Sequence, residues 1–269
     1  MKKILVIGKR GFIGKNVYKH LKRNYYIKLI SFNIFRNKKK IIENFDYIIN
    51  TSINKNYINK KYHQKFDNDF QISKSLVGKS GVYIFLSSRK VYKSNSNIKE
   101  NSKKSPKSYY SKNKLITEKK LYKKLKNNLI ILRISNLIGD KKLIKKKLHK
   151  TFVDIFFQNA KKGIIFNNKK KFKDFISIEK FCEILNEIIK KDLRGIYNVS
   201  IGKKVYLNLL VKWLNKYNKK KCTFYKINSS KEKNFYLNNN KLMSKIKISN
   251  SLAELKNYCL KLSRQKFKN

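Results

Sequence analysis

Short runs of apolar residues recur along most of the chain and are separated by longer amphipathic or polar stretches. Such runs are typical of strands that are buried on both faces of a parallel sheet. They predict strands at residues 4–7, 27–33, 45–50, 82–86, 129–136 and 195–200. Helical spacing of apolar residues predicts helices through Val17 and Leu21, at residues 70–76 and around Tyr110. This alternation predicts an α/β fold with a Rossmann-type, doubly wound parallel sheet.

The pattern is looser after residue 140. It predicts a lysine-rich helix at 148–157, short strands at 163–166 and 172–178, and helices at 184–189, 207–217 and 252–262. No linker of flexible composition divides the chain. We therefore expect residues 1–140 to form the Rossmann-type domain and residues 141–269 to form a smaller region. The two are expected to be interleaved, because the late strand near 195–200 belongs with the sheet.

A glycine-rich turn, G-K-R-G-F-I-G at residues 8–14, directly follows the first predicted strand and opens the first predicted helix. Gly8 permits the tight turn, Gly11 lets the backbone approach a pyrophosphate, and Gly14 allows close packing of helix on strand. The N-terminus of the helix, with Phe12 and Ile13, would then face the anion. The chain has only nine glycines, so three at this spacing favour a dinucleotide site over a plain turn.

The end of the second predicted strand bears on the choice between NAD and NADP. An NAD site usually has an acidic residue there, which binds the ribose 2′-hydroxyl. This chain has Asn33 at that position, while Arg10 and Arg36 could bind a 2′-phosphate. NADP is therefore slightly favoured, although two uninvolved surface arginines are an equal alternative. Thr51, at the end of the third predicted strand, is expected to contact the cofactor.

Tyr110 and Lys114 are four residues apart, which places the phenol and the ammonium on one face of a helix. A nearby cation favours the phenolate and lowers the pKa of a tyrosine, so such a pair can act as a general acid and base. Ser87 and Ser88 close the strand at 82–86, at the sheet edge where open α/β folds bind ligands. A serine pair at this place is otherwise an ordinary helix cap.

The chain has 68 lysine and arginine residues and a net charge of +53. One interpretation is a protein that binds nucleic acid or another polyanion. The other is compositional bias, and we favour it because the lysines are spread along the whole chain and asparagine and isoleucine are abundant too. No nucleic-acid recognition motif accompanies the charge. The positive field should still attract an anionic ligand.

Cysteines and histidines give no sign of a metal site, because Cys182, Cys222 and Cys259 are far apart and the three histidines do not cluster with them. Three unpaired thiols indicate a reducing cytoplasm and no structural disulfides. No stretch approaches the roughly 20 apolar residues that span a bilayer, so no membrane association is expected.

Several motifs in order resemble those of the extended short-chain dehydrogenase/reductase superfamily, in its NAD(P)-dependent epimerase/dehydratase group that acts on nucleotide sugars. The resemblance runs from residue 2 to about residue 248. Besides the glycine turn, the matching segments are S-S-x-x-V-Y at 87–92, P-x-x-x-Y-x-x-x-K-x-x-x-E at 106–118, L-R-x-x-N-x-x-G at 132–139, K-D-F-I at 173–176 and G-I-Y-N-V at 195–199.

The resemblance implies a role for each matching residue. Tyr110 would be the proton donor and acceptor for a sugar hydroxyl or ketone, and Lys114 would lower the pKa of Tyr110 and hold the nicotinamide ribose. Ser88 would form a hydrogen bond with the reacting oxygen, with Ser87 as the runner-up. The hydride moves to or from the nicotinamide, because no side chain can carry it.

The resemblance also implies that the region after residue 140 binds the substrate. Asn136 would contact the substrate, and Lys173 would contact the nucleotide diphosphate. The family often has an arginine in place of Lys173, and a lysine offers a point charge in place of a two-pronged guanidinium.

Dehydratases of the family carry an Asp-Glu pair straight after the catalytic serine or threonine, where this chain has Arg89 and Lys90. This argues against dehydration and leaves epimerisation or keto-sugar reduction at C4, which we expect to serve the synthesis of a surface polysaccharide. The alternative is a catalytically idle NAD(P)-binding regulatory or scaffold protein on the same fold. The family often forms a homodimer through the helix that carries Tyr110, and the lysines on this helix argue against such packing.

Overall fold

The computed structural model describes residues 1–140, 151–226 and 233–267. Its centre is a six-stranded sheet in the order β10-β5-β4-β3-β1-β2, and every pair of neighbours is parallel. The strands are β1 (Lys3–Ile7), β2 (Tyr26–Ile30), β3 (Tyr47–Asn50), β4 (Val82–Ser88), β5 (Leu129–Ile134) and β10 (Gly195–Val199). The predicted α/β fold with a doubly wound parallel sheet is confirmed. The strand order reverses beside β1, and in open sheets such a switch point is where ligands bind.

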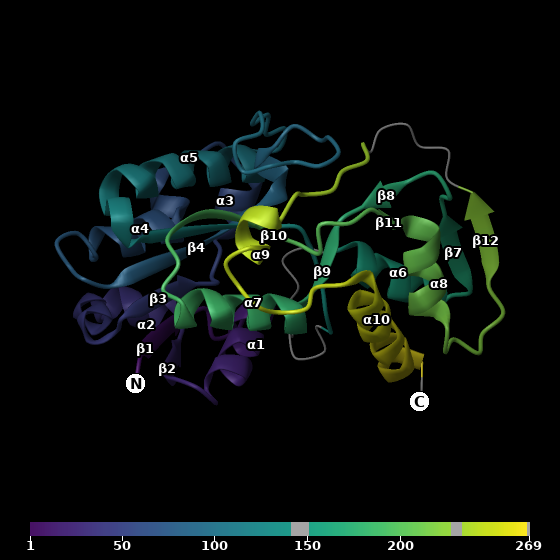
Figure 1. The fold of residues 1–269 in the computed structure, drawn as a ribbon, viewed down its shortest axis with the longest axis horizontal. Helices are drawn as coiled ribbons and strands as arrows, with labels where there is room; N and C mark the ends of the chain where they lie inside the picture. Colours follow the sequence, from purple (N-terminus) through teal and green to yellow (C-terminus); the bar gives the residue numbers. More distant parts are fainter. Residues whose placement is uncertain (141–150, 227–232, 268–269) are drawn as a thin grey trace.

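Helices cover both faces of the sheet, as Figure 1 shows. On one face lie α1 (Phe12–Leu21) and α7 (Ile178–Lys190); on the other lie α3 (Lys55–Asn59), α4 (Asn68–Lys74) and α5 (Tyr109–Leu125). Successive residues of a strand point to opposite faces. In β1, Ile4 and Val6 therefore join the core beneath α1 and α7, whereas Leu5 and Ile7 join the core beneath α4 and α5.

The second strand is shorter than predicted. The extended segment ends at Ile30, and α2 (Phe32–Asn37) starts where the prediction continued the strand to Asn33. The reason is a local cap, because Ser31 accepts a hydrogen bond from the backbone N–H of Ile34. A 3-10 helix, Lys39–Asn44, follows α2. β2 is one of the two edge strands of the sheet.

Two predicted strands are each divided in two. The strand predicted at 129–136 is β5 followed by β6 (Asn136–Ile138), which leaves the main sheet and pairs with β9 (Phe175–Ser177). The strand predicted at 172–178 is β8 (Phe172–Lys173) and β9, separated by the buried Asp174. Both breaks have the same consequence, because β6 and β9 pair with each other in a separate two-stranded sheet.

The later part of the chain builds a second hydrophobic core from α6 (Phe152–Ala160), α8 (Leu207–Asn215) and α10 (Leu252–Phe267), seen on the right of Figure 1. The predicted helix at 148–157 lies partly outside the described residues, and its described part is α6. Short pairs complete this region: β7 (Ile164–Asn167) with β12 (Thr223–Lys226), and β8 with β11 (Val205–Tyr206). The four-residue helix α9 (Asn240–Met243) packs near β10.

The elements α2, α3, α9, β11 and β12 were not predicted, since each is too short to show a clear hydrophobic period. The three cysteines are unpaired, as expected. Burial raises the pKa of both Cys182 and Cys259 to about 12, so these two thiols behave as small apolar core groups. Among the described residues, no helix is both long and apolar enough to cross a membrane.

Candidate active site

The glycine turn after β1 is packed so closely that two of its glycines have no space for a side chain. Gly8 has a φ of +129°, and a Cβ there would lie 2.2 Å from Oγ1 of Thr51. A Cβ on Gly14 would lie 2.6 Å from both the Gly8 carbonyl oxygen and Thr51 Oγ1. Thr51 is fixed in turn, because its N–H and its hydroxyl donate to the Ile7 carbonyl at 2.7 and 3.0 Å. The turn is a backbone cradle between the ends of β1 and β3.

Helix α1 begins in this cradle without a side-chain cap, since its N-cap residue is Gly11. The first N–H groups of a helix are unsatisfied and carry partial positive charge, so they bind anions such as a pyrophosphate. Phe12 and Ile13 pack against the core from the first turn. A Cβ on Gly139 would lie 2.2 Å from Cζ of Phe12, so the phenylalanine ring fills the space that Gly139 leaves open. This cradle fits a dinucleotide cofactor.

Of the residues proposed to choose between NAD and NADP, Arg10 lies in the glycine turn after β1, and Asn33 and Arg36 lie in α2, which follows β2. Ser31 is the residue that directly follows the strand, and Asn33 lies one position into α2. The predicted strand end at Asn33 was therefore wrong, since the observed end at Ile30 is three residues earlier, and neither Ser31 nor Asn33 is acidic. Arg10, Asn33 and Arg36 are all exposed, and their contact with a cofactor stays a prediction.

Tyr110 and Lys114 lie in the first two turns of α5. The helix starts with a capping box, in which Ser108 Oγ accepts from the Ser111 N–H at 3.3 Å and Ser111 Oγ accepts from the Ser108 N–H at 3.0 Å. The cap fixes the start of the helix, so Tyr110 is held in its first turn. Tyr110 is half-buried, whereas Lys114 is only 6% exposed.

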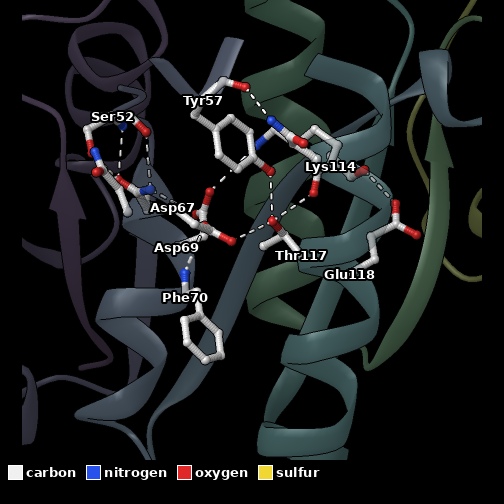
Figure 2. Close-up of polar contacts among 12 residues, drawn as sticks. Ser52, Tyr57, Asp67, Asp69, Phe70, Lys114, Thr117 and Glu118 are labelled. Carbon is white, nitrogen blue, oxygen red and sulfur yellow. Dashed lines mark hydrogen bonds and ion pairs between the residues drawn. The ribbon is translucent and has the colours of Figure 1, made fainter. Parts of the chain in front are cut away.

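Two aromatic rings and a carboxylate surround the ammonium of Lys114, and Figure 2 labels Tyr57 and Asp69 among them. Its Nζ lies 4.4 Å from the ring centroid of Phe85 and 5.6 Å from that of Tyr57. Asp69 Oδ2 is 3.5 Å from the same nitrogen. Phe85 belongs to β4 three residues before Ser88, so α5 packs directly on the strand that delivers the serine.

The two serines at the end of β4 have different surroundings. Ser87 is 4% exposed and donates to Glu118, which also binds Arg133 through two guanidinium nitrogens. Ser88 is half-buried, and its Oγ accepts from the Lys90 N–H at 3.3 Å. The structure thus commits Ser87 to a buried ion-pair network and leaves Ser88 as the serine at the edge of the sheet.

The turn after Ser88 lies beside the first turn of α5. Nζ of Lys90, in the turn that follows β4, is 5.9 Å from the ring centroid of Tyr110. Arg89 stacks on Phe235, with Cζ 3.7 Å from the ring centroid. The structure therefore packs α5, which carries Tyr110 and Lys114, against β4 and the turn that follows Ser88. The catalytic roles of the three residues stay a prediction, and Arg89 and Lys90 stand where dehydratases of the family have acids.

Asn136 and Lys173, the predicted substrate residues, flank one buried segment. Asn136 is half-buried in β6 and donates through Nδ2 to the Asp174 carbonyl at 3.0 Å. Lys173 is half-buried in β8, directly before Asp174. Burial raises the pKa of the Asp174 carboxyl to about 7, against the opposing effect of hydrogen bonds such as that from the Leu237 N–H at 3.0 Å.

Sequence reasoning missed the acidic groups behind Lys114. Asp67 and Asp69 are 0% and 5% exposed and lie at the start of α4, against α5. Burial, followed by the charge of Asp69, raises the pKa of Asp67. A signal existed, because a D-x-D pattern is notable in a chain with only fifteen acidic residues. The ion pair of Asp69 with Lys114 could not be read from this pattern, because the two residues are more than forty positions apart in the chain.

Solved structures with the same fold cover almost the whole chain. A UDP-N-acetylglucosamine 4-epimerase from Methanobrevibacter ruminantium M1 has 18% identity and a TM-score of 0.78, over 98% of this chain and 97% of that chain. The dTDP-glucose 4,6-dehydratase of Bacillus anthracis str. Ames has 16% identity and a TM-score of 0.77, over 100% and 97%. The UDP-glucuronic acid 4-epimerase of Bacillus cereus has 15% identity and a TM-score of 0.77, over 99% and 97%.

At these identities the likeness shows the fold. A comparison with curated proteins gives no match. Family membership comes from the sequence itself, because the model of the NAD dependent epimerase/dehydratase family matches residues 4–200. This match spans the glycine cradle, the end of β4, the Tyr110 helix and the segment around Asn136 and Lys173. The chain therefore belongs to the NAD dependent epimerase/dehydratase family, and its fold and its enzyme class are those that the motifs predicted.

Proposed function

We propose that the protein is an NAD(P)-dependent nucleotide-sugar epimerase or 4-keto-sugar reductase that acts at C4 through Ser88, Tyr110 and Lys114. The observation that carries this proposal is the burial of Lys114 one helical turn from Tyr110, packed on the strand that ends at Ser88. The glycine cradle at the switch point of the same sheet edge fits the cofactor. The enzymes in the solved structures named above bear the names of UDP- and dTDP-linked sugars, and this supports a nucleotide sugar as the substrate.

Bound NAD(P) would supply the hydride acceptor or donor. In the chain, the Tyr110 phenolate oxygen would take the proton from the sugar hydroxyl during oxidation, and the phenol so formed would return it during reduction. The Lys114 ammonium, fixed by its enclosure, would hold the nicotinamide ribose and stabilise negative charge on the phenol oxygen. Ser88 would donate a hydrogen bond to the reacting sugar oxygen.

The two residues after Ser88 disfavour a dehydratase. Removal of water needs an acid and a base beside the sugar, and Arg89 and Lys90 occupy the positions where family dehydratases have that acid pair. Epimerisation and keto-sugar reduction need only the hydride carrier and the proton donor, so both stay within the proposal. We place either activity in the cytoplasm, in a route to surface polysaccharide.

Tyr110→Phe tests the proposal, because it removes the proton donor and keeps the ring. We expect turnover of the active sugar to fall by about 1,000-fold or more, within the range for loss of a positioned acid or base, while NAD(P) still binds. Tyr109→Phe is the matched control, since Tyr109 is the preceding residue and is 45% exposed. Full turnover by Tyr110→Phe in a screen of UDP-, dTDP- and GDP-linked sugars would remove Tyr110 from the mechanism.

The same screen separates the two activities. A reductase consumes NAD(P)H, and the nicotinamide absorbance falls with each turnover. An epimerase returns its hydride, so the absorbance stays constant while the sugar configuration changes. Nicotinamide cofactor retained through purification would favour the epimerase.

A further inference from the structure

The buried cluster around Lys114 contains an ionised partner for the lysine. Asp69 and Lys114 have side-chain exposures of 7% each, and Oδ2 of the carboxylate is 3.5 Å from the ammonium. Water reaches neither group freely, so each charge would cost several kcal/mol in the interior without the other. The pair therefore lets a lysine stay charged at a site closed by the rings of Phe85 and Tyr57.

The second oxygen of Asp69 is held from the sheet. Its Oδ1 accepts a hydrogen bond from the Tyr83 hydroxyl at 2.7 Å and from Asn50 Nδ2 at 2.8 Å. Tyr83 comes from β4, and Asn50 is the last residue of β3. With one oxygen fixed by two strands, the other has a defined direction toward Lys114 on α5, as Figure 2 shows for the two labelled side chains.

Asn50 continues this connection toward the cofactor cradle. Its Oδ1 accepts from the Ser52 N–H at 2.9 Å and from the Ser52 hydroxyl at 2.6 Å. Ser52 directly follows Thr51, which packs against Gly8 and Gly14. A chain of hydrogen bonds thus runs from the residue beside the cradle to the carboxylate that faces Lys114.

The neighbouring carboxyl, Asp67, has a different environment. Its Oδ2 accepts from the Thr117 hydroxyl at 2.6 Å and the Tyr62 hydroxyl at 2.9 Å, and its Oδ1 accepts from the Phe70 N–H at 3.0 Å. These donors are neutral, whereas the ammonium of Lys114 is paired with Asp69. Asp67 is thus a buried carboxyl of the same region that lacks the contact with Lys114, which makes it a matched control.

We propose that Asp69 is the positioning residue of the site, whose carboxylate fixes the Lys114 ammonium in the place and charge state that Tyr110 and the cofactor require. The inference rests on the proposed function, because it assigns Asp69 a role through Lys114. It goes beyond that function by making β3 and β4 part of the machinery that orients the lysine.

The test compares Asp69→Asn, Lys114→Met and their double variant in the full chain. Asparagine keeps an acceptor for Tyr83 and removes the charge. We expect Asp69→Asn to lower kcat about 100-fold, the effect of a misplaced catalytic group, and to weaken NAD(P) binding about tenfold through the loss of a charged hydrogen bond. In the Lys114→Met background the same change should cause no further loss of either quantity, because the partner is gone.

Thermal unfolding gives a third readout. Lys114→Met leaves the Asp69 carboxylate buried without its cation, so we expect Asp69→Asn to raise the unfolding temperature in that background and to lower it in the wild type. Asp67→Asn should leave kcat and NAD(P) binding unchanged.

Losses that add to those of Lys114→Met, or equal losses in Asp67→Asn, would show that Asp69 is only a structural residue and would overturn the proposal. A wild-type protein that binds neither NAD nor NADP would instead overturn the proposed function, and with it the role of Asp69. The two failures are distinguishable, because the first is seen in the variants and the second in the wild type.

Discussion

At the residue scale, Gly139 and Phe12 connect the cofactor cradle to the later part of the chain. A Cβ on Gly139 would lie 2.2 Å from Phe12 Cζ and 2.8 Å from Ile178 Cγ2. Gly139→Ala should therefore lower the free energy of unfolding by about 1–3 kcal/mol, as overpacking does, and weaken NAD(P) binding. Urea unfolding and a cofactor titration measure the two effects. Phe12→Leu, added to Gly139→Ala, should restore part of the stability, and no recovery would show that the ring is not the obstacle.

The two serines at the end of β4 are expected to differ in role, one in catalysis and one in stability. Ser88→Ala should lower kcat by about tenfold to 100-fold, the worth of a hydrogen bond to a charged group, with little change in stability. Ser87→Ala should instead mainly destabilise the protein, because Glu118, which pairs with Arg133, loses a buried hydrogen-bond donor. Steady-state kinetics and urea unfolding of both variants distinguish the catalytic serine from the structural one. The reverse assignment, with turnover lost in Ser87→Ala alone, would return Ser87 to the site.

At the scale of elements, Asp174 joins the β8–β9 segment to the strand-like stretch around Leu237. Its carboxyl is fully buried and its pKa is raised to about 7 by that burial. A raised pKa means that the folded state binds the proton more tightly than the unfolded state. The stability that this group contributes is therefore complete below about pH 4, the ordinary aspartate range, and is lost as the pH rises through about 7.

Urea unfolding at several pH values tests this link. We expect the wild type to lose stability between about pH 4 and about pH 7, relative to Asp174→Asn, which has no such proton to lose. Asn136 and Lys173 lie on this segment, so substrate affinity should weaken over the same range. Parallel stability curves for the two proteins would exclude Asp174 as the titrating group.

Some helices and strands can be predicted from the sequence, whereas contacts between them cannot. The central strands β1, β3, β4 and β5 were predictable because their mainly apolar runs are buried on both faces of the sheet. The end of β2 was not predictable. Apolar residues continue past Ile30 to Phe32, but Phe32 is the first residue of α2, which Ser31 caps. The Tyr110 and Lys114 pair follows from spacing on one helix. The Asp69 contact with Lys114 does not, because it depends on how α4 and α5 pack.

At the scale of the whole molecule, the net charge of +53 comes from lysine and arginine residues spread along the entire chain. Lysines cover even the face of α4 and α5, where Nζ of Lys74, Lys120 and Lys124 lies 5.4, 5.0 and 5.7 Å from the ring centroid of Phe70. A homodimer through α5, the arrangement expected from the family, would bring two such faces together. We expect the protein to be monomeric at low salt and any self-association to increase as salt screens the lysines.

The net charge of +53 should also act on the substrate, because a nucleotide sugar is an anion and the field of the whole chain draws it toward the site. The Debye length shortens from about 30 Å at 0.01 M salt to about 10 Å at 0.1 M. Raising the salt over this range should therefore lower kcat/KM for the nucleotide sugar several-fold, whereas kcat, which concerns the bound complex, should change little. Kinetics in sodium chloride at fixed pH measure both. A kcat/KM that is insensitive to salt would mean that the lysines do not guide the substrate, and their abundance would then reflect composition alone.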